Sequence, residues 1–261
     1  MENLNKISVA FIGSGNVATK LAVSLHEAGI RISEIFSKTL ANANVLANKV
    51  GAIAVANIGD LSSDNDIIII SISDKALHSI DLIKLPQRAL ICHTSGSVGM
   101  DILSFCENYG VFYPLQTLSK TAELDISEVP FCIEANDTTN AERLISLALL
   151  LSAKVSIVNS KQRAQMHLAA VFTCNFSNAM YSIAEDLMQQ SGLDFDYLRP
   201  LIKETAAKAI AHSPSQIQTG PAVRNDRNII DKHIKELDSN TDYKKLYSLI
   251  SNIIYKNSNK A

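Results

Sequence analysis

The chain lacks a marked excess of charge and lacks any long apolar run. Its 24 Lys and Arg residues against 26 Asp and Glu residues give a formal net charge of −2. This balance gives no support to nucleic-acid or anionic-membrane binding, which favours strongly basic surfaces. The most apolar stretch, the isoleucines at 67–70, is too short to span a bilayer and has the length of a strand.

Cysteine is scarce, and tryptophan is absent altogether. The four cysteines are Cys92, Cys106, Cys132 and Cys174. No Cys-x-x-Cys pair and no Cys/His spacing typical of a metal site occurs, so we expect no bound metal. We expect the thiols to be reduced and buried, as in a cytoplasmic protein. Residues 1–6 lack the apolar core of a signal peptide, which also favours a cytoplasmic location.

The first part of the chain alternates between strand and helix patterns. Predicted strands cover residues 7–12, 30–36, 52–55, 67–72, 89–93, 111–113, 131–135 and 155–158. Predicted helices cover residues 17–28, 40–50, 75–83, 101–108 and 141–151. This alternation predicts an α/β fold with a doubly wound parallel sheet of the Rossmann type.

Beyond residue 160 the strand patterns stop and only helical patterns follow. Residues 161–190 contain no glycine or proline and predict one long helix, followed by helices over 196–211, 227–237 and 243–255. We therefore predict two domains, a sheet domain over residues 1–159 and an all-helical domain over residues 160–261.

A Gly-x-Gly-x-x-Ala motif joins the first predicted strand to the first predicted helix. Gly13 lets the backbone turn, Gly15 lets a pyrophosphate approach the main chain, and Ala18 lets the helix pack close to the strand. The helix N-terminus adds free amides and partial positive charge. The context favours dinucleotide binding over a plain tight turn. The predicted cofactor-binding residues here are Gly13, Ser14, Gly15, Asn16 and Val17.

The end of the second predicted strand indicates which dinucleotide binds. An acidic residue about 20 positions after the glycines grips the ribose diol in NAD-binding folds. Here Ser37 and Lys38 stand at that point, and a hydroxyl with a cation suits a 2′-phosphate. This favours NADP over NAD, unless Lys38 is only a solvated loop residue or Glu34 reaches the ribose from a slipped strand end.

Polar residues also stand at the ends of the fourth and fifth predicted strands, where a Rossmann fold forms its ligand crevice. Ser71 and Ser73 are predicted to contact the cofactor, and Asp74 is interpreted as the N-cap of the next helix. His93 is a candidate for general acid–base catalysis. Alternatively, the segment that begins at His93 is only a turn before a short helix. Within it, Thr94 is a candidate for cofactor binding and Ser95 for substrate binding.

The sixth predicted strand ends at Pro114, and a long loop to Pro130 follows. Gln116 lies at the rim of the crevice and is predicted to bind substrate. Tyr113 can donate a proton from this position, although a packed aromatic side chain is the commoner role.

The helical part adds further candidates. His167 and Asn175 are predicted catalytic residues, and Asn178 shares a helix face with Asn175 and is predicted to bind substrate. A hydrogen bond between helices explains these polar side chains equally well. Arg224, after Gly220-Pro221, either clamps a substrate carboxylate or pairs with Asp226, which can cap the next helix.

These segments together resemble a known family of predicted NADP oxidoreductases. The resemblance rests on residues 12–18, 37–39, 93–97, 113–117 and 219–226, and it spans nearly the whole chain. The family joins a Rossmann-like domain to a C-terminal helical domain of unknown function. Its relatives are the deazaflavin-dependent NADP oxidoreductases and the pyrroline-5-carboxylate and ketopantoate reductases. The resemblance implies a helical domain like that of 6-phosphogluconate dehydrogenase, and a homodimer formed through it.

One departure limits what the resemblance implies. Hydroxyacid dehydrogenases of this superfamily place a catalytic Lys, with an Asn one turn later, on the first long helix. In this chain His167 is followed one turn later by Val171, and Asn175 lies two turns away. The Lys–Asn mechanism therefore does not transfer to this chain.

The sequence thus predicts an NADP(H)-dependent oxidoreductase that acts by hydride transfer on a small molecule, with no nucleic-acid or membrane partner. His93 or His167 would move a proton. Two other hypotheses stay open: a dinucleotide-binding sensor or scaffold without turnover, and a helical dimerisation module whose sheet domain has lost its cofactor.

Overall fold

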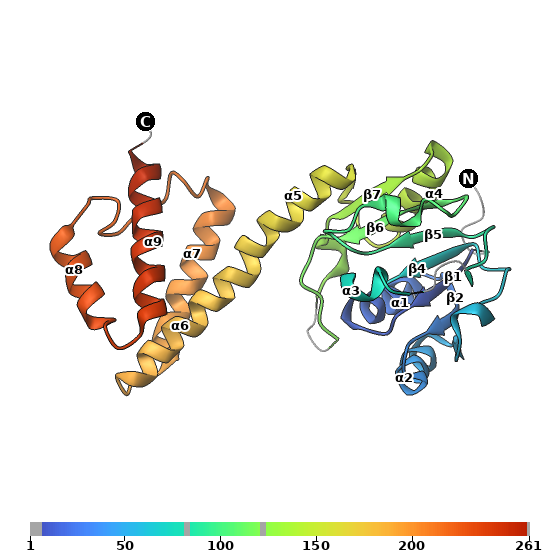
Figure 1. Cartoon of the computed structure of the whole chain (residues 1–261), viewed down its shortest axis with the longest axis horizontal. Coiled ribbons are helices and arrows are strands. Elements are labelled where there is room, and N and C mark those ends of the chain that lie inside the picture. Colours follow the sequence, from blue (N-terminus) through green and yellow to red (C-terminus); the bar gives the residue numbers. More distant parts are fainter. Residues whose placement is uncertain (1–6, 81–83, 121–123, 260–261) are drawn as a thin grey trace. The chain divides into compact units, whose positions relative to one another are not determined.

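The computed structural model describes residues 7–80, 84–120 and 124–259 (Figure 1). The end of the helix predicted over 75–83, and part of the loop before Pro130, lie outside these residues. Eight strands form one sheet in the order β3-β2-β1-β4-β5-β6-β7-β8. Their bounds are β1 Ser8–Ile12, β2 Arg31–Phe36, β3 Ile53–Val55, β4 Ile67–Ile70, β5 Leu90–His93, β6 Tyr109–Pro114, β7 Phe131–Ala135 and β8 Val155–Ile157. The predicted Rossmann-type α/β fold is confirmed.

Nine α-helices are described, together with short 3-10 turns. Their bounds are α1 Asn16–Glu27, α2 Leu40–Val50, α3 Asp74–Leu77, α4 Thr138–Leu149, α5 Ser160–Ala170, α6 Ser177–Gln190, α7 Arg199–Ala211, α8 Arg227–Glu236 and α9 Thr241–Ser258. A π-helical segment, Val171–Phe176, joins α5 to α6, so the long helix predicted over 161–190 is continuous but widens at this point.

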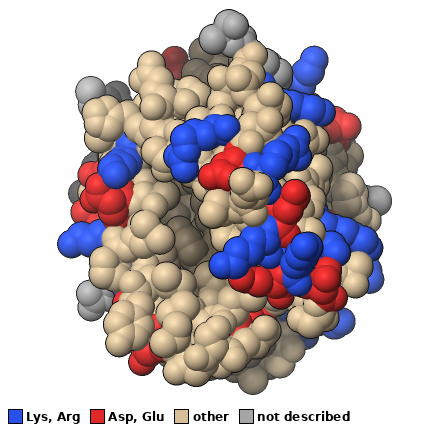
Figure 2. Space-filling view, turned by 90° about the vertical axis from the view of Figure 1, so that its left-hand side faces the viewer, with Lys and Arg blue, Asp and Glu red and all other residues tan. Residues whose placement is uncertain are grey.

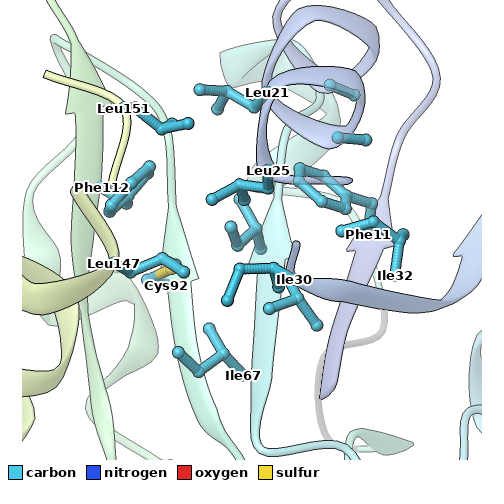
Figure 3. Close-up of a cluster of buried hydrophobic side chains, with 14 of the residues drawn as sticks. Phe11, Leu21, Leu25, Ile30, Ile32, Ile67, Cys92, Phe112, Leu147 and Leu151 are labelled. Atoms are coloured by element: carbon cyan, nitrogen blue, oxygen red, sulfur yellow. The ribbon is translucent and has the colours of Figure 1, made fainter. Parts of the chain in front are cut away.

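The sheet is buried on both faces because its strands alternate apolar side chains between two layers. Phe11 of β1 and Ile67 of β4 face a cluster shared with α1 and α4, in which Leu25 and Leu147 also lie (Figure 3). Ile12, the neighbour of Phe11, faces the opposite cluster. All four isoleucines of β4 are buried, as expected for a parallel strand covered on both sides.

One strand pairing departs from the predicted parallel sheet. β6 and β7 are antiparallel, with Phe112 opposite Ile133, whereas β7 and β8 are again parallel. A parallel neighbour needs a crossover connection, usually a helix, and the described part of the segment between β6 and β7 has only the 3-10 turn Ile126–Glu128. The chain therefore reverses its direction at this edge.

The helix predicted over 101–108 is also wrong in its length. Only a 3-10 turn, Met100–Leu103, forms there. Because β6 begins at Tyr109, too little chain is left for a longer helix. The helix predicted from Lys75 is short as well: α3 ends at Leu77, and residues 78–80 are not helical.

The chain divides into two compact units, residues 1–175 and 176–261. Strands end with β8, near the predicted boundary at residue 159, but α5 belongs to the first unit. The N-terminal turn of α5 is bonded to the sheet, as Ser160 donates both its backbone N–H and its hydroxyl to Glu134 of β7. We call residues 1–175 the sheet unit and residues 176–261 the helical unit.

The helical unit has little interior of its own. Among its described residues only Ala222 and Ile230 are buried. Apolar side chains are exposed instead, including Ile210 at 87% and Leu201 at 63%. Figure 2 shows acidic and basic side chains interspersed on one face, with wide areas that carry no charged residue.

No helix in the described ranges combines the length and the apolar character that crossing a membrane requires.

Candidate functional site

A cavity of about 1070 Å³ opens at the carboxyl ends of the parallel strands in the sheet unit. Such crevices are the ligand sites of open α/β sheets. All ten residues predicted to bind a cofactor line it: Gly13, Ser14, Gly15, Asn16, Val17, Ser37, Lys38, Ser71, Ser73 and Thr94. Ser95, Gln116 and His167 line it as well, and so does Tyr113. One cavity therefore joins the glycine loop to the candidate reacting groups.

The glycine loop has the geometry that the motif predicts. Gly13 has a φ of 118°, and a Cβ there would lie 2.1 Å from the carbonyl oxygen of Ser71. Gly15 precedes α1, and a Cβ on it would meet nothing within 4 Å. Open space thus adjoins the unpaired amides at the start of a 12-residue helix. This donor set fits a pyrophosphate, because the amides can donate to its oxygens.

The strand end that follows β2 carries a hydroxyl and a cation. The Ser14 hydroxyl donates to Ser37 at 2.9 Å, which links the glycine loop to this strand end, and Lys38 is an exposed residue of the cavity wall. The Glu34 carboxylate accepts instead from the Asn65 side chain at 2.6 Å and is not part of the wall. The acid that complicates the sequence interpretation is therefore held away from the cavity.

The capping role predicted for Asp74 is wrong. Ser73 caps α3, since its hydroxyl accepts from the Ala76 N–H, and Asp74 is the first helical residue. The Asp74 carboxylate accepts from the Ser97 hydroxyl. Burial raises the pKa of Asp74, but the hydrogen bond from Ser97, helped by His167 nearby, outweighs it and holds this pKa below its usual value. A carboxylate thus lies in the cavity wall.

Tyr113 and His167 meet in the cavity wall. The Tyr113 hydroxyl and the His167 Nδ1 are 3.1 Å apart, and the two rings pack edge to face. Burial raises the pKa of Tyr113 to about 12, so its hydroxyl keeps its proton at neutral pH. A Cβ on Gly96 would lie 2.7 Å from the His167 Nδ1 and 2.8 Å from the Tyr113 ring. The absence of a side chain at Gly96 is what lets the pair form.

His93 is not brought to the cavity. Its side chain is 0% exposed, and its Nδ1 accepts from the Ser95 N–H at 3.1 Å while its Nε2 faces the carbonyl of Gly99. Burial, with the charge of Arg163 adding to it, lowers the pKa of His93 to about 4. His93 is therefore neutral at pH 7, and its contacts shape the loop beneath the cavity.

A buried ion pair that the sequence reasoning missed anchors the start of α5. Arg163 is 1% exposed, pairs with Glu134 of β7 and donates to the carbonyl of Val98 at 2.6 Å. Arg163 and His167 are four residues apart and share a helix face. The pair thus fixes the face of α5 that carries His167. One sequence signal could have revealed this pair. A glutamate inside the otherwise apolar strand Phe131–Ala135 needs a polar or charged partner when it is buried.

The other predicted residues lie elsewhere. Asn175 lines a second, smaller cavity that shares Tyr113 and His167 with the first. Asn178 and Arg224 belong to the helical unit, and their substrate-binding roles stay predictions. Asp226 caps α8 through the Ile229 N–H, as predicted.

All four cysteines are free thiols. Cys92, Cys106 and Cys132 are buried as expected, but Cys174, in the π-helical segment, is exposed. Within the described ranges, no group of His, Cys, Asp and Glu has the arrangement of a metal site.

Two family models match the chain. Residues 8–91 match the family described as "NADP oxidoreductase coenzyme F420-dependent", which covers the glycine loop, β1–β4 and the first residues of β5. Residues 129–254 match the family described as "Domain of unknown function (DUF2520)", which covers β7, α4, β8 and most of the helices that follow.

Solved structures resemble the whole chain. A Bacteroides fragilis protein assigned as an NADP oxidoreductase is 39% identical, covers 97% of this chain and 100% of its own length, and superposes with a TM-score of 0.90. A protein from Thermotoga maritima, 19% identical, covers 96% of this chain and 99% of its own length with a TM-score of 0.82.

More distant structures share the fold. An imine reductase from Myxococcus stipitatus, solved with NADP+, is 13% identical, covers 95% of this chain and 92% of its own, and has a TM-score of 0.62. A search of curated proteins gave no match. The chain belongs to an NAD(P)-dependent oxidoreductase family in which an F420-dependent NADP oxidoreductase domain is followed by a DUF2520 domain.

Proposed function

We propose that this protein is an NADP(H)-dependent oxidoreductase that acts on a small molecule by hydride transfer. One observation carries the proposal: a single cavity of about 1070 Å³ is lined both by the glycine loop and by the Tyr113–His167 pair. When bound, the nicotinamide cofactor supplies or accepts the hydride, and the chain positions and polarises the reactants.

Preference for NADP over NAD is supported by the wall that follows β2. Lys38 can offer a charge and Ser37 a hydroxyl to a 2′-phosphate, whereas the nearest acid, Glu34, accepts from Asn65 and from the Ser62 N–H. A ribose diol therefore finds no carboxylate partner on this wall among the described residues of the strand end, and a phosphate finds a cation.

Proton transfer is assigned to the Tyr113–His167 pair. Tyr113 keeps its proton at neutral pH, so its hydroxyl can donate to an oxygen or nitrogen that gains negative charge as a hydride arrives at the adjacent carbon. His167, 3.1 Å away, can then return a proton to the tyrosine oxygen through Nδ1. The Asp74 carboxylate lies in the same cavity wall as His167.

The remaining predictions are part of the same proposal. Asn175 and Asn178 would orient the substrate, Arg224 would bind an anionic group on it, and the protein would work in the cytoplasm. A homodimer through the helical unit is supported by the apolar side chains exposed there, such as Ile210 and Leu249. A helical unit with so little interior gains stability when a second copy covers these side chains.

Cofactor binding is tested by calorimetry with NADPH and NADH. We expect NADPH to bind at least 10-fold more tightly, and the Lys38→Ala variant to lose about 10-fold in NADPH affinity while NADH affinity stays the same. Lys49→Ala, an exposed lysine outside the cavity wall, is the matched control. Equal affinity for both cofactors contradicts the NADP preference, and binding of neither contradicts the oxidoreductase.

Turnover separates an enzyme from a dinucleotide-binding sensor. With a substrate found by screening NADPH oxidation, we expect Tyr113→Phe to lower kcat by about 10²-fold or more while the Kd for NADPH changes little. Tyr109→Phe, on the same strand but outside the cavity wall, is the control. If NADPH binds and Tyr113→Phe turns over normally, the proton-transfer assignment is wrong.

A further inference from the structure

A second cavity of about 450 Å³ adjoins the first at the Tyr113–His167 pair. The two cavities share Tyr113, Gln116 and His167 in their walls. A molecule in the second cavity therefore adjoins the candidate proton donor, whereas the glycine loop lines the first cavity only. Its volume lies within the usual range of small-molecule sites. We call it the second chamber.

The walls of the second chamber come from two segments that are far apart in the sequence. One is the segment after β6, Leu115 to Thr117, and the other runs from Met166 through the π-helical segment to Asn175. The Thr117 hydroxyl and the Cys174 thiol are 2.9 Å apart, so the two walls are linked at one side of the chamber. π-Helical turns of this kind are frequent at functional sites.

The chemistry of these walls is mainly apolar, with neutral polar groups. Met166, Ala169, Ala170 and Val171 supply aliphatic surface, and Thr117 and Thr173 supply hydroxyls. Within the described part of the chain, no Lys, Arg, Asp or Glu is among the lining residues. Lys38 and Lys120 line the first cavity only.

We propose that the second chamber is the substrate subsite, and that it selects uncharged, mainly apolar carbonyl or imine compounds against carboxylates. This proposal rests on the proposed function, because it takes Tyr113 as the group that meets the acceptor atom of the substrate. A carboxylate in the chamber loses its hydration without gaining a cation, and burying an unpaired charge is costly. The wall of the adjoining first cavity carries the Asp74 carboxylate, whose charge has the same sign as that of a carboxylate substrate.

The experiment compares four ketones that differ in charge but share one carbonyl group. Binding of acetophenone, 4-acetylbenzamide, 4-acetylbenzoate and (4-acetylphenyl)trimethylammonium is measured by ligand-observed NMR, with and without saturating NADPH. The benzamide controls for the size of the carboxylate. We expect both neutral ketones to bind at least 10-fold more tightly than the benzoate. Equal or tighter binding of the benzoate, or no binding of the neutral ketones, overturns the proposal.

A charge introduced into the wall supplies the reciprocal test. Ala170→Arg is expected to raise affinity for 4-acetylbenzoate at least 10-fold and to leave the benzamide no better bound. Leu168→Arg, an exposed position on the same helix outside the chamber, is the matched control and should change neither. If Ala170→Arg fails to fold by circular dichroism, Thr173→Lys places a cation in the same wall. An unchanged benzoate affinity in the folded variant contradicts the location.

The outcomes separate this inference from the proposed function. Absence of NADPH binding defeats the oxidoreductase, while the order of ketone affinities can still be read without cofactor. NADPH binding combined with a preference for the benzoate defeats the uncharged subsite and leaves the oxidoreductase intact.

Discussion

The sheet unit and the helical unit are of very different construction. The sheet unit buries apolar side chains in layers on both faces of its sheet, and even a charged pair, Arg163 and Glu134, lies within it. The helical unit buries two residues among those described and carries its ion pairs on the surface. The stability of a unit depends mainly on the apolar area that it buries and less on how strongly its sequence favours helix or strand. We therefore expect the sheet unit to be the more stable of the two.

Removing one ion pair from each unit gives the largest predicted contrast. Arg163→Met leaves the Glu134 carboxylate without its partner, so we expect the free energy of unfolding to fall by about 3–5 kcal/mol. Lys208→Met breaks the exposed pair with Glu204 in the helical unit, and we expect the free energy of unfolding to fall by less than about 0.5 kcal/mol. Chemical denaturation measures both. Similar losses for the two variants remove the contrast between the units.

The buried histidine makes the sheet unit sensitive to acid. In the unfolded chain His93 takes up a proton as the pH falls below about 6.5, whereas in the folded chain it does so only at about 4. The contribution of neutral His93 to the free energy of unfolding is therefore complete above pH 6.5. It is lost as the pH falls toward 4, by about 3 kcal/mol in total. Between pH 4 and 7, the free energy of unfolding of His93→Gln should change less with pH than that of the unchanged protein. The same pH dependence of the unfolding free energy in both proteins would contradict this.

A glycine in each unit tests how tightly the backbone is packed. Gly13→Ala combines a positive φ with a contact of 2.1 Å to a carbonyl oxygen, so we expect a loss of about 2–3 kcal/mol. Gly192, after α6 in the helical unit, also has a positive φ but has open space around it. We therefore expect Gly192→Ala to lower the free energy of unfolding by about 1 kcal/mol. Thermal unfolding ranks the two variants, and a larger effect at Gly192 would reverse the comparison.

Exposed apolar side chains should have the smallest effect on folding and the clearest effect on association. Leu249→Glu with Ile253→Glu on α9 is expected to shift the dimer toward monomer at least 10-fold in sedimentation equilibrium. Ile53→Glu, at an even more exposed position on β3 of the sheet unit, is the control and should leave the sedimentation unchanged. A monomer in the unchanged protein would refute the proposed homodimer.

The sequence predicted the features that depend on local interactions and missed those that depend on contacts between distant segments. The glycine loop and α2 were predicted within a residue or two, because strand patterns and breakers act locally. The antiparallel β6–β7 pair was missed, since pairing direction depends on the connection across the sheet edge rather than on either strand's own pattern.

The same limit applies to the site. Ser37 and Lys38 were found from their place after a strand, and they do line the cavity. His93 is instead the last residue of β5, and its side chain is buried with the rest of the strand. The Arg163–Glu134 pair joins residues 29 apart, and only the folded chain shows that they meet.

The missing side chain at Gly96 has a consequence for how this protein can change. Any other residue at 96 would collide with both Tyr113 and His167, so positions 96, 113 and 167 vary as one unit. A library that randomises one of them alone is expected to return mostly inactive clones. An engineer who wants a different substrate should therefore leave this triplet intact and diversify other residues that line the second chamber, such as Ala169 and Ala170, whose side chains are small.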